Sequence, residues 1–463
     1  MLEMRMTELA KQINVPRLFG TNGIRGIAGS EVTSDLAFRV GSALATIFPD
    51  KKVLLGRDGR ISSVMLLEGV AAGILAHGND VDDYGLITTP ALEFSVNQVG
   101  SSVGVMVTAS HNPPEYNGFK IVDFDGIEIA RPKEEKMERL IAQDEWRTRR
   151  EPGNRRTIKT GISTYLDRIE GKIGSKEQVA DLRIVVDTGN GASALTTLEL
   201  FRKIGSDVIA INDEIDGNFP GRNSEPRPEN LNALVQVVRT EGADLGVAHD
   251  GDGDRAVFVD EKGEVIPGDR SLALIEDDLL KAHRGAKVVT PINTSMVVSD
   301  VAKKRNGKVV LTKVGSIEVS RTVVRERALL GGEENGGIFY SPHHPVRDGT
   351  MAAILVVNSM IKNRKRVSQL LAQLPKYYMV KEKIFCKETA KERATNALKV
   401  KLKGKISSTL DGVRVDIDGV GWVLVRASGT EPLLRLYAEA KTEDGLAKIL
   451  EEFRPMVLKA AKS

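Results

Sequence analysis

The sequence of 463 residues contains a single cysteine, Cys386, and few aromatic side chains, which make up 5% of the chain. One cysteine excludes a disulfide within the chain and a cysteine-rich metal site, and it favours a reducing compartment. Residues 1–19 contain no apolar signal core, and no apolar run approaches the ~20 residues of a membrane span. We therefore expect a cytoplasmic protein without a membrane partner.

An excess of charge of one sign is also lacking. The net charge is +3, and basic residues alternate with acidic ones, as in residues 132–139. Such mixed runs are typical of solvated helix faces rather than of a basic stripe that binds nucleic acid. The Walker pattern G-x-x-x-x-G-K-[ST] is absent as well, so phosphate chemistry in this chain need not involve ATP. We expect small-molecule partners and no nucleic acid.

What the sequence does contain is an alternation of short β-branched runs with longer helical patterns. Residues 34–48 are typical of a helix that Thr33 or Ser34 caps. The runs that predict buried strands are residues 53–55, 104–107, 184–186 and 288–289. This alternation predicts an α/β fold with mixed, mostly parallel sheets and helices on both faces.

The chain is too long for one core, and its pattern changes along its length. Small polar loops at residues 56–60, 187–191 and 291–295 end three of the strands and suggest one α/β unit used three times. Beyond Pro375, antiparallel strands and a helix over residues 442–453 indicate a smaller α+β domain. The predicted strands there are residues 381–386, 413–420 and 422–426. We predict domains at residues 1–156, 157–260, 261–374 and 375–463.

The first chemical motif is Thr108-Ala109-Ser110-His111-Asn112-Pro113, which follows the strand at residues 104–107. It places a serine hydroxyl on the loop that leaves a buried strand, where α/β proteins keep reactive groups. A serine that carries a phosphate needs no histidine to activate it. Taken alone, these residues also fit a polar turn.

The second motif is Asp250-Gly251-Asp252-Gly253-Asp254-Arg255. Three carboxylates at alternate positions can converge on one divalent cation, and open positions suit Mg²⁺ shared with a phosphate. The spacing also imitates an EF-hand, with Glu261 at its twelfth position, but Arg255 stands where that loop needs glycine, and residues 256–259 are typical of a strand. A solvent-exposed turn is the other alternative, although three like charges repel unless a cation holds them.

The third motif is the glycine-flanked segment at residues 331–337, which contains Glu333 and Asn335. Its glycines permit a tight loop, and a carboxylate with an amide can bind sugar hydroxyls. The same segment, taken alone, is also a flexible acidic turn.

The fourth motif is Arg426-Ala427-Ser428-Gly429-Thr430-Glu431-Pro432, with Arg435 after it. Two guanidinium groups, two hydroxyls and the backbone N–H groups around Gly429 can form a phosphate cradle. A structural turn is the alternative.

Residues 189–194 are similar to the G-x-G-x-x-A dinucleotide fingerprint, with Asp213 downstream. Short glycine patterns are weak signals, and this one begins late in the chain. A dinucleotide site is therefore the disfavoured interpretation of this segment.

Together, the four motifs resemble those of the α-D-phosphohexomutases, the family of phosphoglucomutase, phosphomannomutase and phosphoglucosamine mutase. The resemblance spans the chain in the family's order and implies three similar α/β domains followed by a smaller fourth. It also includes Phe19-Gly20-Thr21-Asn22-Gly23-Ile24-Arg25-Gly26, Gly56-Arg57-Asp58 and Asn117-Gly118-Phe119-Lys120.

The resemblance implies a role for each motif. Ser110 would be the phosphoserine, and its phosphate would hold Mg²⁺ together with Asp250, Asp252 and Asp254. Lys120 would transfer protons, helped by Arg25 and His111 near the phosphoserine. The substrate-binding residues would be Arg255, Glu333, Asn335, Arg426, Ser428, Gly429, Thr430 and Arg435.

The implied reaction moves a phosphoryl group between the 1- and 6-positions of a hexose phosphate through a sugar bisphosphate, which also serves as activator. Residues 118–120 favour glucose and mannose phosphates, but Asn335 stands where the family usually has serine and Gly337 where it usually has histidine. Phosphoglucosamine mutase is therefore an alternative, and a metal-dependent sugar phosphatase, in which water completes the reaction, is a further one. The family includes monomers and larger assemblies, so a homo-oligomer is compatible with the resemblance.

Overall fold

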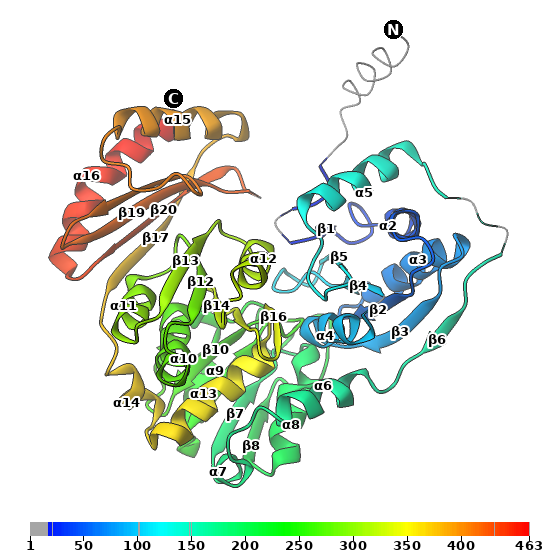
Figure 1. Cartoon of the computed structure of the whole chain (residues 1–463), viewed down its shortest axis with the longest axis horizontal. Helices are drawn as coiled ribbons and strands as arrows, with labels where there is room; N and C mark the ends of the chain where they lie inside the picture. The colour runs from blue at the N-terminus through cyan, green and yellow to red at the C-terminus, as the bar shows by residue number, and fades with distance from the viewer. Residues whose placement is uncertain are drawn as a thin grey trace.

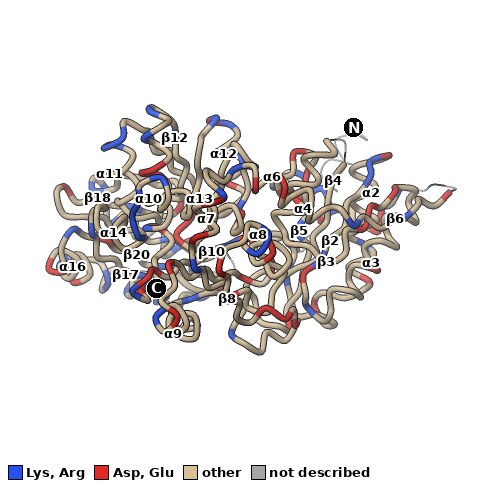
Figure 2. The backbone as a smooth tube through the Cα atoms, turned by 90° about the horizontal axis from the view of Figure 1, so that it is seen from below, with Lys and Arg blue, Asp and Glu red and all other residues tan. Residues whose placement is uncertain are grey.

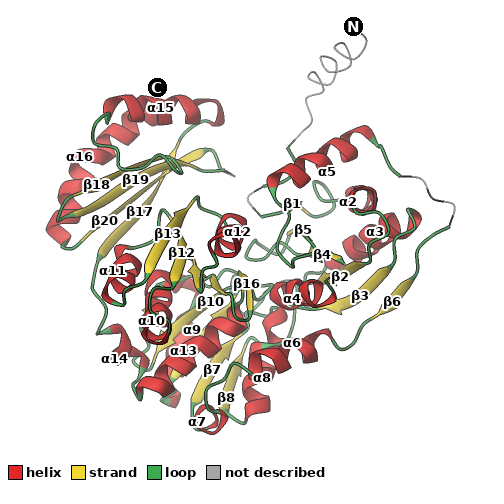
Figure 3. Cartoon of the chain, viewed as in Figure 1, coloured by secondary structure: helices red, strands yellow, loops and turns green. Residues whose placement is uncertain are grey.

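The computed structural model of the chain describes residues 17–20, 22–100, 102–147, 149, 151–429 and 431–462. Four β-sheets follow one another along the chain (Figure 3). Figure 1 shows four units in an open arc, with the first unit in blue and cyan at one end and the C-terminal unit in orange and red at the other. The predicted fold class, three similar α/β units and a smaller α+β unit, is confirmed.

The first unit is built around a six-stranded sheet. Its elements are β1 (Ile24–Ile27), α2 (Ser34–Ile47), β2 (Val53–Arg57), α3 (Ser63–Ala76), β3 (Val81–Leu86), α4 (Thr89–Val99), β4 (Val103–Val107), β5 (Tyr116–Val122), α5 (Arg131–Gln143) and β6 (Arg155–Thr157). The strand order is β1-β5-β4-β2-β3-β6. The predicted helix is α2, and Thr33 caps it by accepting a hydrogen bond from the N–H of Leu36 at 3.1 Å.

The second unit has a five-stranded sheet in the order β11-β10-β9-β7-β8. Its elements are α6 (Gly161–Glu170), α7 (Lys176–Ala180), β7 (Arg183–Asp187), η1 (Ala192–Leu195), α8 (Thr197–Ile204), β8 (Asp207–Ile211), η2 (Pro228–Asn230), α9 (Asn232–Glu241), β9 (Leu245–His249), β10 (Ala256–Asp260) and β11 (Val265–Ile266). The predicted strand at residues 256–259 is β10, which supports the argument against an EF-hand.

The third unit also has five strands, in the order β13-β12-β14-β15-β16. Its elements are α10 (Gly268–Ala282), β12 (Lys287–Pro291), α11 (Met296–Lys304), β13 (Lys308–Thr312), α12 (Ser316–Glu326), β14 (Leu330–Gly332), β15 (Ile338–Tyr340), β16 (His344–Arg347), α13 (Gly349–Asn363) and α14 (Val367–Leu371). Buried side chains of the first three units, among them Leu54, Val186 and Val288, form one continuous hydrophobic cluster. The three α/β units are therefore held together by a shared core.

The C-terminal unit has an antiparallel sheet in the order β17-β20-β19-β18 and a core of its own. Its elements are β17 (Tyr378–Phe385), η3 (Glu388–Ala390), α15 (Lys391–Lys401), β18 (Val413–Ile417), β19 (Gly421–Ala427), β20 (Leu433–Ala440) and α16 (Glu443–Lys462). Glu439 Oε2 links it to the third unit by accepting hydrogen bonds from the N–H of Met296 and from Trp422 Nε1, each at 2.8 Å.

The three α/β sheets share one arrangement at the edge where the predicted motifs lie. β4, β9 and β14 each pair in parallel with one neighbour and antiparallel with the other. The Ser110 loop follows β4, the Asp250 loop follows β9, and the Glu333 loop follows β14. The same strand position thus supplies one motif from each unit, which places the three loops equivalently in their units.

Charged residues are distributed over the whole molecule. Figure 2 shows Lys and Arg interspersed with Asp and Glu along the backbone of all four units. Among the residues that the structure describes, no helix has both the length and the apolar character needed to cross a membrane.

Candidate active site

Ser110 lies on the loop after β4 and is buried. Its backbone is left-handed, with φ of 50°, which turns the chain sharply at the end of the strand. Its Oγ atom donates a hydrogen bond to Asp250 Oδ2 at 2.7 Å and lies 3.3 Å from His111 Nδ1. The predicted phosphate carrier is therefore in direct contact with the predicted metal loop.

A buried ion pair under this loop holds it in place. Arg60 and Asp58 are both buried, and Arg60 Nε donates to Asp58 Oδ2 at 3.1 Å. The guanidinium of Arg60 also donates to four backbone carbonyl oxygens of the loop and of the start of β5, those of Ser110, Asn112, Pro113 and Tyr116. Asp58 in turn accepts from Thr108 Oγ1 at 2.7 Å. The shape of the Ser110 loop is thus fixed by groups in the loop after β2.

The loop after β9 gathers three buried carboxylates. One oxygen each from Asp250, Asp252 and Asp254 lies within 4.8 Å of the others. Asp252 Oδ1 and Asp254 Oδ1 are buried and have no hydrogen-bond partner among the described residues. Burial and the charges of Asp254 and Asp252 raise the pKa of Asp250, a sign of repulsion that a cation would relieve. These hard oxygen ligands fit Mg²⁺.

Basic side chains surround this carboxylate cluster. Lys120 Nζ donates to Asp252 Oδ2 at 2.9 Å and to Asp254 Oδ2 at 2.8 Å. Although burial lowers it, the charges of these two carboxylates raise the pKa of Lys120 above its ordinary value. Arg255 Nε lies 3.9 Å from Asp250 Oδ2 and 3.8 Å from Asp254 Oδ1. The predicted lysine and arginine therefore face the same cluster as Ser110.

Arg25 and His111 also lie on the Ser110 side of the site. Arg25 Nη1 donates to Asn112 Oδ1 at 2.9 Å, while its Nε and Nη2 atoms are buried without a hydrogen-bond partner among the described residues. Burial and the charges of Arg255 and Arg25 lower the pKa of His111, so its imidazole is neutral at neutral pH. The unpaired guanidinium donors of Arg25 suit an anion such as a phosphate.

The loop after β14 contains Glu333 and Asn335. Glu333 is buried, and burial raises the pKa of its carboxyl. Asn335 Oδ1 accepts a hydrogen bond from the N–H of Gly337 at 3.1 Å, so this oxygen stabilises the turn. Asn293 Nδ2 donates to Glu334 Oε1 at 3.0 Å. Glu333 is therefore the carboxylate of this loop that is left to receive a ligand.

The predicted phosphate cradle lies in the C-terminal unit. Arg426 and Arg435 are direct cross-strand neighbours on β19 and β20, so their side chains share one face of the sheet. Arg426 Nε donates to Asp411 Oδ2 at 2.9 Å, and Arg435 Nη2 donates to Glu431 Oε2 at 2.6 Å. Gly429 is exposed. Thr430 lies outside the described residues, as does Thr21 of the first quoted segment.

Lys391 on α15 binds the backbone of the cradle loop. Its side chain is buried, and Nζ donates to the carbonyl oxygen of Ser428 at 2.6 Å and to that of Glu431 at 3.1 Å. Ser428 Oγ accepts from the N–H of Glu431 at 3.2 Å. The ammonium group thus fixes the carbonyls of the loop on the side of α15.

The structure brings most of the predicted residues into one site, but not all of them. Ser110, His111, Lys120, Arg255 and the three aspartates make mutual contacts, whereas Arg426 and Arg435 donate to Asp411 and Glu431 within the C-terminal unit. Figure 1 shows the tips of β19 and β20 pointing from that unit toward the side of the first unit. The roles of all these residues remain predictions.

Sequence reasoning did not identify four further residues at the site. Arg60, Thr89, Arg347 and Lys391 are buried and bind the loops just described. Thr89 Oγ1 donates to Asp252 Oδ2 at 2.5 Å, and Arg347 Nη2 donates to Asp254 Oδ2 at 2.6 Å. The only sequence signal for any of them is that Arg60 ends a loop already noted for its polar residues.

The glycine pattern at residues 189–194 has a structural role in this site. The N–H of Ala192 donates to the carbonyl oxygen of Gly251 at 3.0 Å, and a Cβ atom on Gly191 would lie 2.8 Å from that same oxygen. The segment therefore supports the backbone of the Asp250 loop, in agreement with the argument against a dinucleotide site.

Comparison with known proteins identifies the family. The sequence matches the descriptions "Phosphoglucomutase/phosphomannomutase, alpha/beta/alpha domain I" over residues 16–148, domain II over residues 163–263, domain III over residues 267–378 and the C-terminal domain over residues 363–456. A phosphoglucomutase/phosphomannomutase from Thermococcus kodakarensis is 39% identical over 445 residues, which cover 94% of this chain and 97% of that protein.

A probable phosphoglucosamine mutase from Methanopyrus kandleri is 40% identical over 444 residues, which cover 95% of this chain and 98% of that protein. The crystal structure of a phosphoglucomutase/phosphomannomutase family protein from Burkholderia thailandensis matches with a TM-score of 0.87 at 29% identity, covering 96% of this chain and 98% of that one. The chain therefore belongs to the phosphoglucomutase/phosphomannomutase family of α-D-phosphohexomutases and is a phosphohexomutase.

Proposed function

We propose that this phosphohexomutase moves a phosphoryl group between the 1- and 6-positions of glucose and mannose phosphates, with Ser110 as the phosphate carrier. The observation that carries the proposal is the 2.7 Å hydrogen bond from Ser110 Oγ to Asp250 Oδ2. It puts a buried hydroxyl at a cluster of carboxylates that suits Mg²⁺. Bound at Asp250, Asp252 and Asp254, Mg²⁺ would compensate negative charge on the phosphoryl group.

In the proposed cycle, phosphorylated Ser110 donates to the free hydroxyl of a hexose monophosphate. The bond between phosphorus and Ser110 Oγ breaks, a bond between phosphorus and the sugar oxygen forms, and the proton of the sugar hydroxyl ends on Ser110 Oγ. The other phosphate of the resulting bisphosphate then returns to Ser110. Because the transition state of phosphoryl transfer is loose, catalysis rests mainly on positioning and on charge.

The side chains around Ser110 match these needs. Lys120 is protonated beside Asp252 and Asp254, so it can donate a proton to an oxygen of the reacting group. It can accept the hydroxyl proton only when the charge of those carboxylates is compensated, because they raise its pKa. Arg255 adds positive charge, and the burial of Ser110 keeps water from the phosphoserine.

The cradle accounts for the phosphate that the hexose monophosphate already carries. Arg426 and Arg435 share one face of β19 and β20, and Ser428 and Gly429 lie on the connecting loop. A cradle that recognises only a phosphate can hold either the 1-phosphate or the 6-phosphate, which a mutase requires.

Phosphopeptide mass spectrometry tests the carrier. After incubation with Mg²⁺ and glucose 1,6-bisphosphate, a peptide that contains Ser110 should carry a phosphate, and Ser110→Ala should abolish both this phosphate and mutase activity. Ser163→Ala, at an exposed serine on α6, is the matched control and should leave both unchanged. Full mutase activity in Ser110→Ala would refute the proposal.

Phosphoglucosamine mutase is the second candidate, because the 40% identical relative from Methanopyrus kandleri bears that name and the loop with Asn335 and Gly337 departs from the common pattern. A parallel assay of glucose, mannose and glucosamine phosphates, each with its bisphosphate activator, separates the two. Glucosamine phosphate as the only substrate converted would favour the second candidate. Release of free phosphate without isomer formation would favour a sugar phosphatase instead.

A further inference from the structure

A buried arginine that belongs to none of the four motifs joins two of them. Arg347 is the last residue of β16, and its side chain is 4% exposed. Its Nη2 atom donates to Asp254 Oδ2 at 2.6 Å, and its Nη1 atom lies 3.6 Å from Glu333 Oε2. One guanidinium group therefore contacts the carboxylate cluster of the second unit and the sugar loop of the third.

This contact decides which oxygen of Asp254 stays available to a cation. Asp254 Oδ2 accepts from Arg347 at 2.6 Å and from Lys120 at 2.8 Å, whereas Oδ1 has no hydrogen-bond partner among the described residues. Two donors occupy the lone pairs of Oδ2, so Oδ1 is the atom that can bind a metal. Groups that orient metal ligands in this way change metal affinity when they are removed.

Gly337 leaves the space that the arginine occupies. A Cβ atom at this position would lie 2.6 Å from Arg347 Cδ and 3.0 Å from its Cγ. Real Cβ atoms do not approach other atoms as closely as 2.6 Å, so any side chain at position 337 would push the arginine aside. The backbone of the sugar loop is therefore shaped around Arg347.

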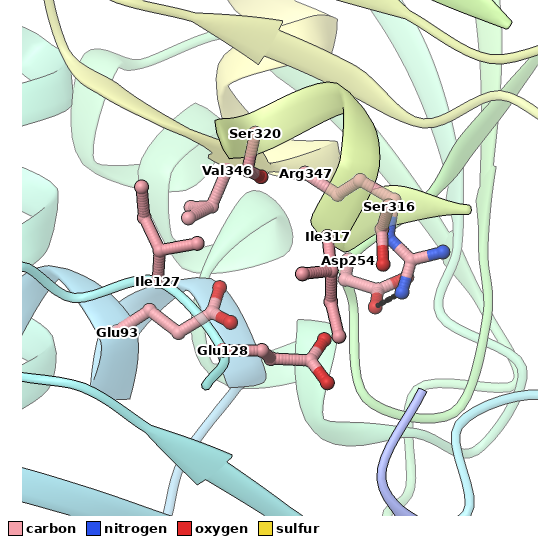
Figure 4. Close-up of a pocket in the computed structure, with 9 residues that line it drawn as sticks. All are labelled: Glu93, Ile127, Glu128, Asp254, Ser316, Ile317, Ser320, Val346 and Arg347. Atoms are coloured by element: carbon pink, nitrogen blue, oxygen red, sulfur yellow. Dashed lines mark hydrogen bonds and ion pairs between the residues drawn. The ribbon is translucent and has the colours of Figure 1, made fainter. Parts of the chain in front are cut away.

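The surroundings of Arg347 are acidic. Figure 4 shows a small cavity beside Asp254 into which Glu93 and Glu128 extend their carboxylates, and Arg347 is the only basic residue among the described residues that line it. Although burial lowers it, the charges of Asp254 and Glu333 raise the pKa of Arg347. A permanent cation at this point holds like-charged groups together that would otherwise repel one another.

We propose that Arg347 is a positioning residue for the phosphoryl transfer. It orients Asp254 so that Oδ1 faces the cation, and it holds Glu333 at a fixed place relative to that carboxylate for binding of the hexose hydroxyls. The inference rests on the proposed function, because it assigns Asp254 to the metal and Glu333 to the sugar. It predicts a change in both metal affinity and KM, whereas an arginine with a merely structural role would change only thermal stability.

The test compares Arg347→Ala, Arg347→Lys and Gly337→Ala with the parent enzyme. Calorimetry on dephosphorylated protein should show Mg²⁺ affinity lowered about 10- to 100-fold in Arg347→Ala, the range found for groups that orient metal ligands. The KM for the hexose phosphate should rise by about the same order. Arg347→Lys, which keeps the charge but not the forked geometry, should be intermediate. Gly337→Ala should resemble Arg347→Lys because it displaces the guanidinium.

Two controls make the outcome specific. Arg305→Met removes another ion-paired arginine of the third unit, whose Nε atom lies 2.8 Å from Asp277 Oδ1, and should change neither Mg²⁺ affinity nor KM. In the double variant Gly337→Ala/Arg347→Ala, the alanine at position 337 should have a smaller effect than in the parent, since the Arg347 atoms it would displace are gone and only its 3.2 Å approach to Glu333 Oε2 remains.

Parental Mg²⁺ affinity and KM in both Arg347 variants would overturn the inference, as would an undiminished effect of Gly337→Ala in the Arg347→Ala background. The proposed function fails on a different result, namely no phosphate on Ser110 in the parent enzyme. Mg²⁺ affinity is measured without turnover, so it reports on Arg347 in either case.

Discussion

Replacing Arg60 with methionine tests whether the buried pair below the Ser110 loop controls that loop. The guanidinium is completely buried, pairs with Asp58 at 3.1 Å and donates to four backbone carbonyls. Methionine replaces the aliphatic stem of arginine but offers no donor. The substitution leaves the carboxylate of Asp58 buried without its cation and the four carbonyls without this donor.

Removing one partner of a buried, hydrogen-bonded ion pair costs about 3–5 kcal/mol. For a domain of about 150–250 residues each kcal/mol lowers Tm by about 3 °C, so Arg60→Met should lower the Tm of the transition in which the first unit unfolds by roughly 10 °C. The Ser110 loop should also lose its fixed geometry. Because misplacement of a reacting group by about 1 Å costs roughly 100-fold in rate, phosphorylation of Ser110 should slow by that order.

Scanning calorimetry measures the change in Tm, and hydrogen exchange of peptides that span residues 106–120 shows whether the loop opens locally. The loss of loop geometry is measured as the rate of Ser110 phosphorylation by glucose 1,6-bisphosphate. Arg57→Met is the matched control, since this neighbouring arginine donates a hydrogen bond to the carbonyl of Asp58 at 3.0 Å, and its loss should cost about 1 kcal/mol. A Tm within 2 °C of the parent together with parental phosphorylation would refute the reasoning.

Three other substitutions have effects that follow from single residues. Burial lowers the pKa of His344 to about 4. Between pH 6.5 and pH 4 the unfolded chain therefore binds one more proton at this position than the folded chain, and the stability falls as the pH drops through this window. His344→Gln should remove up to about 3 kcal/mol of this pH dependence, measured as Tm against pH, and an unchanged profile would contradict the expectation. Both carboxylate oxygens of Glu276 are buried without a hydrogen-bond partner among the described residues, and burial raises its pKa. Glu276→Met should therefore raise Tm at pH 7.5 by an amount equivalent to about 1–3 kcal/mol, with the gain shrinking toward pH 4.5, and a lower Tm at pH 7.5 would be the opposite of this expectation. Lys391→Met removes charge-assisted hydrogen bonds to the cradle loop, which are worth about 1.5 kcal/mol. The KM for the hexose phosphate should rise about tenfold with little change in kcat. A lower kcat at parental KM in steady-state assays would exclude a role of Lys391 in holding the cradle loop.

Patterns that lie within a few consecutive residues predicted much of this molecule. The helix α2, the strands β2, β4, β7 and β12, and the C-terminal α+β unit follow from hydrophobic spacing and turn residues, because burial of one face dictates that spacing. The convergence of the three carboxylates in the Asp250 loop could also be predicted, because all three belong to one short turn.

The sequence did not predict elements whose hydrophobic pattern is not periodic, and it predicted an early end for a helix that contains proline. β20 is buried on both faces apart from Arg435, so its sequence does not alternate, and it was not predicted as a strand. The last helix was predicted to end at Phe453, yet α16 continues through Pro455 to Lys462. Pro455 is exposed, so water can reach the carbonyl whose hydrogen bond the proline removes.

Contacts between distant segments could not be predicted from residue spacing; only the family resemblance implied that Ser110 meets the Asp250 loop. Arg60 binds a loop 50 residues away in the sequence, and Arg347 binds Asp254 at a separation of 93 residues. Arg347 stands in no pattern that distinguishes it from the other lysines and arginines of the chain, and the polar loop that Arg60 ends does not indicate what its side chain binds. Their partners depend on how the sheets are placed in space, which short-range spacing does not encode.

The left-handed backbone at Ser110 limits which residue can serve as the proposed phosphate carrier. With φ at 50°, a threonine would place its branched side chain against the backbone, at a cost of about 1–2 kcal/mol or more, although its hydroxyl has the same chemistry. Aspartate adopts this conformation far more readily. The proposed carrier is thus restricted by the shape of the main chain as well as by its reactivity: Ser110→Asp should be compatible with the loop backbone, whereas Ser110→Thr should distort it.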